Sequence, residues 1–197
     1  MKKVSVLLAD GFEEVEALTA VDFLRRAKIY VDTVSITDEY KVCGAHGINV
    51  QTEDLFDEVN FVEFDMIVLP GGMPGTTNLK EHEGVRRVVK DFVEEGKPVG
   101  AICAAPTILA DLDLLKGKRV TCYPSCEADI QGAVLTHAPA AVEGKIITGQ
   151  GVGSAIDFAL KLVEKLEGPE KAKEIVEKMA LQGLGLEIPI TEKDGVE

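Results

Sequence analysis

A cysteine stands where an apolar segment of the sequence passes into a helical one. Pro98 to Ile102 is typical of a short buried strand, and Ala105 to Leu112 is rich in helix formers, with Pro106 at a tolerated first-turn position. Cys103 is therefore predicted at a helix N-terminus, where free amides and the helix dipole stabilise an anion. Such a position can lower the pKa of a thiol from ~8.5 into the range of roughly 3.5 to 7.5, so that the nucleophilic thiolate dominates at neutral pH. The alternative is that Cys103 is a small buried hydrophobic residue, and its position alone favours neither interpretation.

The glycine-rich run 70–75, Pro-Gly-Gly-Met-Pro-Gly, follows another predicted core strand. Unobstructed amides in such a run can form an oxyanion hole when negative charge develops on a carbonyl oxygen. We expect Gly72 and Ala104 to donate these hydrogen bonds and Gly71 to line the same pocket. The alternative is that the glycines only shape a tight turn between strand and helix. Nucleotide binding is not predicted, because neither this run nor 149–154 has the required motif in the right place.

Three glutamates open the first predicted helix, where acidic side chains complement the dipole and usually remain solvated. They are Glu13, Glu14 and Glu16. Glu16 also lies on an apolar stripe at helical spacing, and Glu13 shares much of that face. The apolar residues of the stripe are Ala20, Phe23, Leu24 and Ala27. Beside a thiolate in a dry pocket, a carboxyl group is hard to ionise, so Glu16 and Cys103 are expected to share one proton. A protonated Glu16 then donates a hydrogen bond to sulfur.

The histidines and the remaining cysteines carry no comparable pattern. We expect all three histidines to be exposed rather than catalytic: His46, His82 and His137. Cys122 and Cys126 have no second Cys or His pair at metal-binding spacing, so no metal site is predicted. Together with Cys43 they are interpreted as structural thiols.

The elements that position these residues alternate between strand and helix. Strands are predicted at 4–9, 31–36, 66–69, 98–102, 119–122, 133–135 and 145–148. Helices are predicted at 13–27, 83–95, 105–112, 155–166 and 169–181, and a projecting hairpin at 40–50. The alternation indicates an α/β fold with a mostly parallel sheet and helices on both faces. Ligands of such sheets bind beyond the carboxyl ends of the strands, where the loops 10–16 and 70–75 and the turn around Cys103 fall.

Composition limits the classes of protein to consider. A chain of 197 residues that is 46% hydrophobic is expected to form a single domain, with 182–197 either loose or packed. Its 21 basic and 34 acidic residues give a net charge of −13, which opposes binding to nucleic acid or to anionic membranes. We find no secretory start and no membrane-spanning stretch, and the four cysteines lack a disulfide framework. A cytoplasmic location is therefore expected.

Three blocks occur together in the order 9–16 (ADGFEEVE), 69–72 (LPGG) and 101–106 (AICAAP). In this order they resemble the ThiJ/PfpI superfamily, and within it the DJ-one branch, with similarity from Lys3 to about Leu166. The resemblance implies a flavodoxin-like sandwich, related to class I glutamine amidotransferases, and a homodimer. It also implies a nucleophilic cysteine at Cys103, a functional glutamate at Glu16, and backbone donors at Gly72 and Ala104.

At three positions this sequence departs from the pattern of related proteins, and these departures narrow the set of relatives whose activity it can share. Peptidase-like members that resemble PfpI often carry a histidine directly after the nucleophile, where this chain has Ala104. Members of the DJ-one branch commonly place a pocket histidine two residues after a Val-Thr strand end, where this chain has Tyr123, which we expect to line the pocket. The related amidotransferases need a late His-x-Glu pair, which nothing after Cys103 provides.

The first functional hypothesis is an enzyme without cofactor or metal that acts on small reactive carbonyls or glycated groups, of the glyoxalase III or deglycase type. Cys103 attacks the aldehyde, Gly72 and Ala104 hold the oxyanion, and Glu16 moves a proton between adjacent carbons before water releases a hydroxyacid such as lactate. The first alternative is a redox-sensing stress chaperone, in which Cys103 oxidises to a sulfinate. The second alternative is an intracellular peptidase of the PfpI type.

Overall fold

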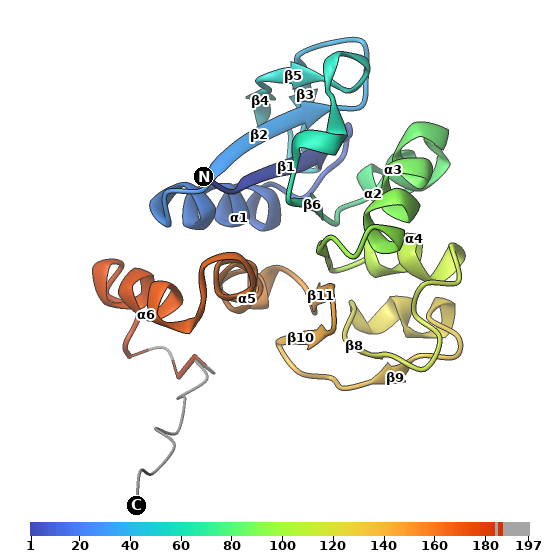
Figure 1. Ribbon diagram of the computed structural model, residues 1–197. Helices are drawn as coiled ribbons and strands as arrows, with labels where there is room; N and C mark the ends of the chain where they lie inside the picture. The colour runs from blue at the N-terminus through green and yellow to red at the C-terminus, as the bar shows by residue number, and fades with distance from the viewer. Residues whose placement is uncertain (184, 187–197) are drawn as a thin grey trace, which may run out of the picture.

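A seven-stranded sheet forms the centre of the computed structural model, which describes residues 1–183, 185 and 186 (Figure 1). The strand order is β10-β11-β7-β6-β1-β2-β5, and every neighbouring pair is parallel except β10 with β11. The strands are β1 (Lys3–Leu8), β2 (Tyr30–Ser35), β5 (Asp54–Leu55), β6 (Met66–Leu69), β7 (Val99–Ile102), β10 (Ala140–Glu143) and β11 (Ile146–Gly149). The predicted mostly parallel α/β sheet is confirmed.

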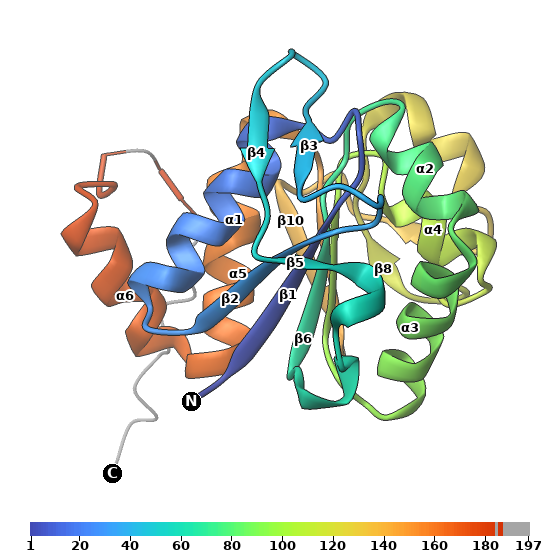
Figure 2. The same ribbon diagram turned by 90° about the horizontal axis from the view of Figure 1, so that it is seen from above.

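Helices cover both faces of this sheet, as the two views in Figures 1 and 2 show. One face carries α1 (Glu14–Arg26), α5 (Ala155–Glu167) and α6 (Pro169–Lys178). The other face carries α2 (Gly75–Glu81), α3 (Glu83–Glu94) and α4 (Pro106–Asp111). Successive strand residues point to opposite faces, so in β1 Val6 packs under α1 and α5 while Leu7 joins the core beneath α3 and α4. The sheet therefore divides the hydrophobic core into two layers.

Smaller elements lie around the central sheet. A two-stranded hairpin of β3 (Lys41–Cys43) and β4 (Asn49–Gln51) projects beyond it, as predicted for 40–50 (Figure 2). The short strands β8 (Arg119–Val120) and β9 (Val134–Leu135) pair in parallel with each other in a separate sheet. Short 3₁₀ helices occur at η1 (Phe56–Glu58), η2 (Phe61–Glu63), η3 (Pro124–Asp129) and η4 (Val152–Ser154).

The sequence-based assignment missed some of these elements. It predicts a loop at 70–75 and no helix before Glu83, because Pro74 and Gly75 are strong turn formers, yet Pro74 is the N-cap of α2. It also missed the edge strands β5 and β10, and it did not foresee that β8 and β9 would form their own sheet. Of the segment 182–197, residues 184 and 187–197 lie outside the described residues, whereas Leu186 packs against the core.

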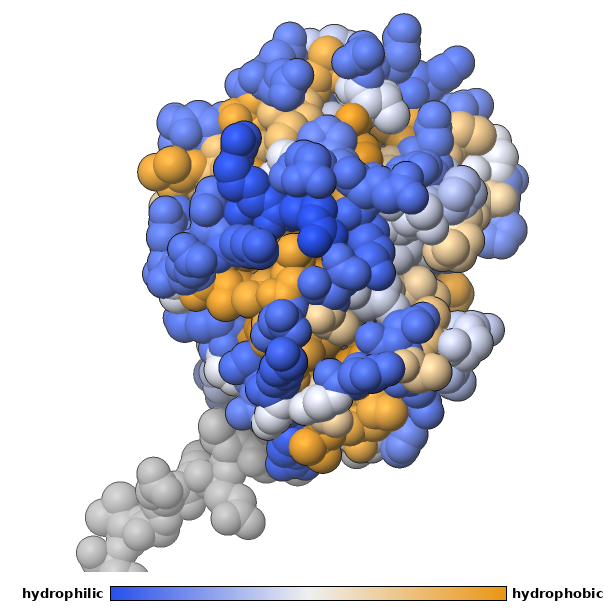
Figure 3. Space-filling view, turned by 90° about the vertical axis from the view of Figure 1, so that its right-hand side faces the viewer, coloured by the Kyte–Doolittle hydropathy of each residue, from blue (hydrophilic) through white to orange (hydrophobic). Residues whose placement is uncertain are grey.

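The face of the molecule that carries α3 and α4 is mostly hydrophilic, with several separate hydrophobic patches (Figure 3). Within the described part of the chain, no helix is both long enough and apolar enough to cross a membrane.

Candidate active site

Cys103 occupies the sharp turn between β7 and α4. Its backbone has a φ of +64°, in the left-handed region that costs a residue with a Cβ about 1–3 kcal/mol. Hydrogen bonds hold the turn from both sides: the Cys103 N–H donates to the Gly149 carbonyl at 2.9 Å, and the Tyr123 N–H donates to the Cys103 carbonyl at 2.8 Å. The neighbouring strand β11 and the segment after β8 thus fix this turn. The predicted junction of strand and helix is confirmed.

Gly71 and Gly72 bring a second loop against this turn. A Cβ atom on Gly71 would lie 2.6 Å from the Cys103 Cβ and 2.6 Å from Glu16 Oε2. Gly72 has a φ of +92°, and a Cβ there would lie 2.4 Å from the backbone nitrogen of Glu13. Neither position has room for a side chain, because the side chains of Cys103 and Glu16 approach Gly71 closely and the backbone of residues 11–13 approaches Gly72. Glycine is therefore required here for close packing as well as for the turn.

Glu16 enters the site from the first turn of α1. The helix begins after Glu13, whose Oε2 accepts a hydrogen bond from the Glu16 N–H at 2.8 Å and so satisfies a free amide of the first turn. The side chain of Glu16 is buried, with Glu16 only 1% exposed, and its Oε2 accepts the Gly71 N–H at 2.9 Å. The carboxyl group is also hydrogen-bonded to the thiol of Cys103, whereas Oε1 is buried without a partner that would stabilise a negative charge.

The carboxyl group of Glu16 and the thiol of Cys103 each affect the pKa of the other. Burial raises the pKa of Glu16 to about 7, with a small contribution from the charge of Glu13, although hydrogen bonds to Cys103 and Gly71 oppose the shift. Burial also raises the pKa of the Cys103 thiol to about 12, and the charge and hydrogen bond of Glu16 add to this. Hydrogen bonds from the Ala104 and Gly72 amides to the sulfur lower the pKa of the thiol, but they do not outweigh the other effects.

The prediction of a lowered Cys103 pKa from the helix N-terminus is therefore wrong. The amides do reach the sulfur, but desolvation and the neighbouring Glu16 carboxylate favour the protonated thiol. The two groups titrate as a coupled pair, in which burial raises both pKa values and Glu16 is the group whose pKa lies near 7. The structure thus brings together the predicted Cys103, Glu16, Gly71, Gly72 and Ala104, with the carboxyl group of Glu16 hydrogen-bonded to the thiol.

Tyr123, the remaining predicted pocket residue, borders a neighbouring cavity of about 620 Å³. Its ring lies over Gly151, where an added Cβ would be 3.2 Å from the ring, and Val152 and Asp157 are among the other lining residues. Cys103 is not among the described residues that line this cavity. Tyr123 is therefore a backbone neighbour of the thiol residue and a wall of the adjoining cavity.

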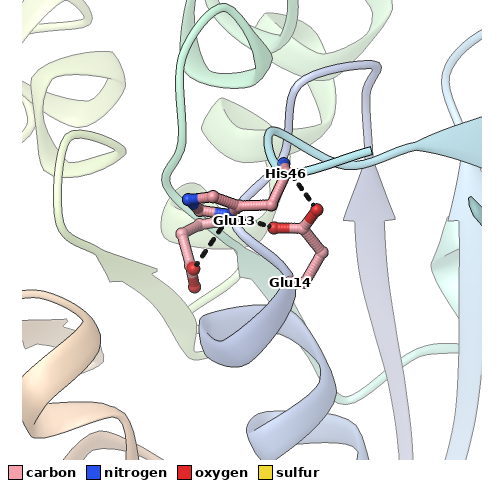
Figure 4. Close-up of side chains that lie close together, drawn as sticks. All are labelled: Glu13, Glu14 and His46. Carbon is pink, nitrogen blue, oxygen red and sulfur yellow. Dashed lines mark hydrogen bonds and ion pairs between the residues drawn. The ribbon is translucent and has the colours of Figure 1, made fainter. Parts of the chain in front are cut away.

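A carboxylate and histidine cluster adjoins the site at the start of α1 (Figure 4). Potential ligand atoms of Glu13, Glu14 and His46 lie within 4.8 Å of one another. The carboxylate of Glu14, however, already accepts hydrogen bonds from the His46 N–H and His46 Nδ1, each at 2.7 Å, and from the Ile48 N–H at 3.4 Å. The cluster is thus a hydrogen-bonded anchor between α1 and the turn of the β3–β4 hairpin. The sequence did not reveal it, because Glu14 was expected in solvent and is only 3% exposed.

The other histidines and cysteines have distinct positions. His46 and His137 have side chains that are 69% and 63% exposed, in agreement with the prediction. The prediction of an exposed His82 is wrong, because His82 is half-buried, its Nδ1 accepts the Val85 N–H at the start of α3, and its ring packs against Phe56. The remaining cysteines range from buried to exposed: Cys122 is buried, Cys126 half-buried and Cys43 exposed.

Comparisons with known proteins agree with this architecture. The model of the DJ-1/PfpI family matches residues 2–165. Protein DJ-1 homolog B of Arabidopsis thaliana is 35% identical over 99% of this chain, but the chain spans only 45% of the length of that protein. Protein dj-1beta of Drosophila melanogaster is 34% identical, over 88% of this chain and 94% of its own. A protein of Caenorhabditis elegans named glutathione-independent glyoxalase DJR-1.2 is 33% identical, over 91% of this chain and 97% of its own.

Solved structures give the same result. A DJ-1 superfamily protein from Salmonella typhimurium, crystallised as a cysteine-to-alanine mutant, has a TM-score of 0.87 and 36% identity, and the match covers 91% of this chain and 98% of that one. Toxoplasma gondii DJ-1, in an oxidized form, has a TM-score of 0.87 and 35% identity with the same coverage of both chains. The family model, the related sequences and the solved structures all match nearly the whole described chain. The chain therefore belongs to the DJ-1/PfpI family.

Proposed function

We propose that this protein is a glyoxalase without a cofactor, which converts small dicarbonyl compounds such as methylglyoxal into hydroxyacids such as lactate. The observation that carries the proposal is the hydrogen-bonded pair of Glu16 and Cys103. A carboxyl group with a pKa of about 7 is half ionised at neutral pH and is a suitable base for the proton of an adjacent thiol. The 33% identical relative named a glutathione-independent glyoxalase supports the same reaction class.

In the first step, the sulfur of Cys103 attacks the aldehyde carbon of the substrate. A C–S bond forms, the π electrons of the carbonyl move to oxygen, and the thiol proton passes to Glu16, so that no free thiolate needs to accumulate. The amides of Gly72 and Ala104 already donate toward the sulfur, so they are close to the oxygen that becomes negative on the attacked carbon. Glu16 then gives its proton to this oxygen, which yields a hemithioacetal.

In the second stage, Glu16 acts as a carboxylate again. It takes the proton from the carbon bonded to sulfur, and the electrons move to the neighbouring carbonyl to give an enediolate. The hydroxyl proton on the first carbon then passes to the oxyanion on the neighbouring carbon, the carbonyl next to sulfur forms, and Glu16 returns its proton to the neighbouring carbon. The product is a thioester of the hydroxyacid. Water adds to the thioester, the C–S bond breaks, and the released sulfur regains a proton. Atoms and electrons balance as one dicarbonyl plus one water giving one hydroxyacid, with no external oxidant or reductant.

The test is loss of methylglyoxal and formation of lactate by purified protein and by three variants. We expect Cys103→Ser and Glu16→Gln each to lower kcat/KM by about 10²-fold or more, because one removes the nucleophile and the other the base. Cys43→Ser is the matched control, because Cys43 is exposed on the hairpin, and it should keep full activity. Unchanged turnover by Cys103→Ser would contradict the proposal.

A second function, redox sensing by Cys103, is favoured by the same amides. Two equivalents of peroxide would each transfer an oxygen atom to sulfur and leave as water, and the resulting sulfinate oxygens would accept hydrogen bonds from Gly72 and Ala104. The oxidized form of the 35% identical Toxoplasma gondii protein is compatible with this role. Mass spectrometry after mild peroxide treatment tests it: selective gain of two oxygens on Cys103 without carbonyl turnover favours sensing, and turnover without oxidation favours catalysis.

We also propose that the protein forms a homodimer through α1 and the adjoining hairpin. Val15 and Leu18 on α1 are 50% and 39% exposed, and Ile48 in the hairpin turn is 54% exposed. Hydrogen bonds between Glu14 and the hairpin turn hold these two elements together. An exposed apolar surface of this kind favours association with a second copy.

A further inference from the structure

A cleft of about 290 Å³ lies near the amino ends of β1 and β2, away from the candidate active site. It opens beside Lys3 and Tyr30, the first residues of β1 and β2, whereas Cys103 follows the carboxyl end of β7. The cleft is dominated by charged and polar side chains, among them Lys3, Tyr30, Asp32, Asp54, Glu58 and Glu63. Its volume is close to the lower end of the range for small-molecule sites.

The negative charges of the cleft exceed its positive charges. Lys3 is paired with Glu63, with 3.0 Å between Nζ and Oε2. Among the described residues, no cationic side chain forms an ion pair with the other three acids. These acids are Asp32, Asp54 and Glu58. The cleft therefore has a negative charge that the chain itself leaves uncompensated.

Asp32 is the unusual member of this set, because it is only 6% exposed. Its carboxylate accepts a hydrogen bond from the hydroxyl of Tyr30, but its Oδ1 is buried with no partner. On the neighbouring strand, Ser5 lies at the same register position, and its buried hydroxyl also has no partner. Buried polar atoms are almost always hydrogen-bonded in folded proteins, so the unpaired Oδ1 of Asp32, a residue that lines the cleft, indicates a missing partner.

The electrostatic environment of Asp32 points to a cationic partner. Burial raises the pKa of Asp32, and the charges of Asp54 and Glu53 raise it further, although Tyr30 and Lys3 act in the opposite direction. A carboxylate in such a place is costly to ionise unless a positive charge approaches it. A bound cation would offset both the burial of Asp32 and the repulsion from its acidic neighbours.

The spacing of the carboxylates selects the kind of cation. Among the described residues, the one group whose ligand atoms lie close enough for a single metal ion is Glu13, Glu14 and His46, and the acids of this cleft do not form such a group. Because the carboxylates are spread along the cleft, they suit a ligand that carries several positive charges at separate positions. Val59 and Phe64 also line the cleft and offer apolar surface to a methylene chain between those charges.

We propose that this cleft binds a small linear organic cation with two or more ammonium groups, anchored by Asp32 and held at its outer end by Asp54 and Glu58. The ammonium hydrogens donate to the carboxylates as charge-assisted hydrogen bonds, the strongest kind available to an exposed cleft. The Tyr30 ring forms part of the wall, and it already has the ammonium of Lys3 at 5.9 Å from its centre, a distance suited to cation–π attraction.

The test is calorimetric titration of the full chain with spermidine, and with a monoamine and Mg²⁺ as comparison ligands. We expect saturable binding of spermidine at one site, and a loss of affinity of at least about tenfold in Asp32→Asn, because the variant keeps the shape but removes the buried charge. The matched control is Glu177→Gln, which makes the same change of charge on an exposed residue of α6 and should bind like the unchanged protein.

Two further measurements keep the test decisive. Asp32→Asn is expected to raise the Tm of the free protein, because it removes a buried charge that has no ion pair, and to leave methylglyoxal turnover unchanged. If that variant does not fold, Asp54→Asn at the half-buried position replaces it, with the same expected loss of affinity. Equal spermidine affinity in the cleft variants and Glu177→Gln, or equally tight binding of Mg²⁺, would show only diffuse attraction to an acidic surface and would overturn the proposal.

Discussion

At the scale of single residues, the chemistry of this site depends on how one proton is divided between Glu16 and Cys103. Both groups are desolvated, so each resists ionisation, and ionisation of one disfavours ionisation of the other. Glu16 ionises first, because its pKa of about 7 lies well below the pKa of about 12 of the thiol. In the proposed reaction the thiol therefore gives its proton to Glu16 during the attack and not before it.

This order of ionisation predicts the pH dependence of the proposed reaction. Because Glu16 must be ionised to accept the thiol proton, kcat/KM for methylglyoxal should rise as the pH rises through about 7, and fall about tenfold per pH unit below it. Steady-state kinetics across this range, with Glu16→Gln as the control that lacks the rise, provides the measurement. A rise centred instead on ~8.5, the pKa of a free thiol, would show that Cys103 titrates independently of Glu16.

Gly72 gives a second prediction at this scale. Gly72→Ala should lower the free energy of unfolding by at least about 1–2 kcal/mol, because its φ of +92° disfavours any Cβ and the added atom would meet the backbone of Glu13 at 2.4 Å. Urea denaturation measures this change. Gly183→Ala is the control, since an added Cβ there meets no atom within 4 Å. Equal losses of stability in the two variants would argue against a close-packed loop at Gly72.

At the scale of elements, the hairpin of β3 and β4 is attached to the start of α1 through Glu14. Hydrogen bonds from His46 and from backbone amides lower the pKa of Glu14, although burial acts in the opposite direction. The same contact raises the pKa of His46, first through the hydrogen bond to Glu14 and then through its charge. The hairpin turn is therefore held by backbone hydrogen bonds to Glu14 and, in addition, by one ring contact that depends on the protonation of an exposed histidine.

The pH dependence of this anchor follows from the raised pKa of His46. Its contribution is complete below 6.5 and is lost as the pH rises through the raised value, whereas the contribution of Glu14 is lost only at acidic pH. Hydrogen exchange of the amides at 44–48 should show His46→Ala weakening protection at about pH 6 and changing it little at about pH 9.

The control for this experiment is His137→Ala, which removes another exposed histidine that contacts a glutamate, at 3.1 Å from Glu127. It should leave the hairpin amides unchanged at every pH. Loss of protection in His46→Ala that is the same at both pH values would mean that packing of the ring, and not its charge, anchors the hairpin.

At the scale of the whole molecule, association is the property that exposed apolar residues control. In the proposed dimer, α1 and the hairpin turn form the interface, so Leu18→Glu places one buried charge from each of the two copies in it. This variant should therefore raise the dissociation constant at least about tenfold. Sedimentation equilibrium measures this change against the 21.2 kDa monomer. Val62→Glu, at a 72% exposed residue beyond this surface, is the control and should not alter association. A monomeric unchanged protein would exclude the dimer.

Much of this molecule could be predicted from local sequence. The buried strands are short apolar runs, so 66–69 was assigned with the bounds that β6 has, and the period of α1 correctly placed Glu16 on the buried face. The apolar run 98–102 placed Cys103 at the end of a strand, and the rule that parallel strands bring their carboxyl ends together placed Gly72 beside it. Each of these inferences needs only the residues of one element and its immediate neighbours.

Only the tertiary structure decided the ionisation of the site and the surroundings of the remaining acids. The helix terminus near Cys103 favours a thiolate, but the pKa depends on how much water remains and on the charge of a glutamate 87 positions away in the chain, which burial and contact determine. Glu14 likewise opens a helix, where acidic side chains usually remain solvated, yet Glu14 is buried, as is Asp32 on β2. Local periodicity specifies which residues face inward, whereas the balance of desolvation and charge depends on every group that folding brings within reach.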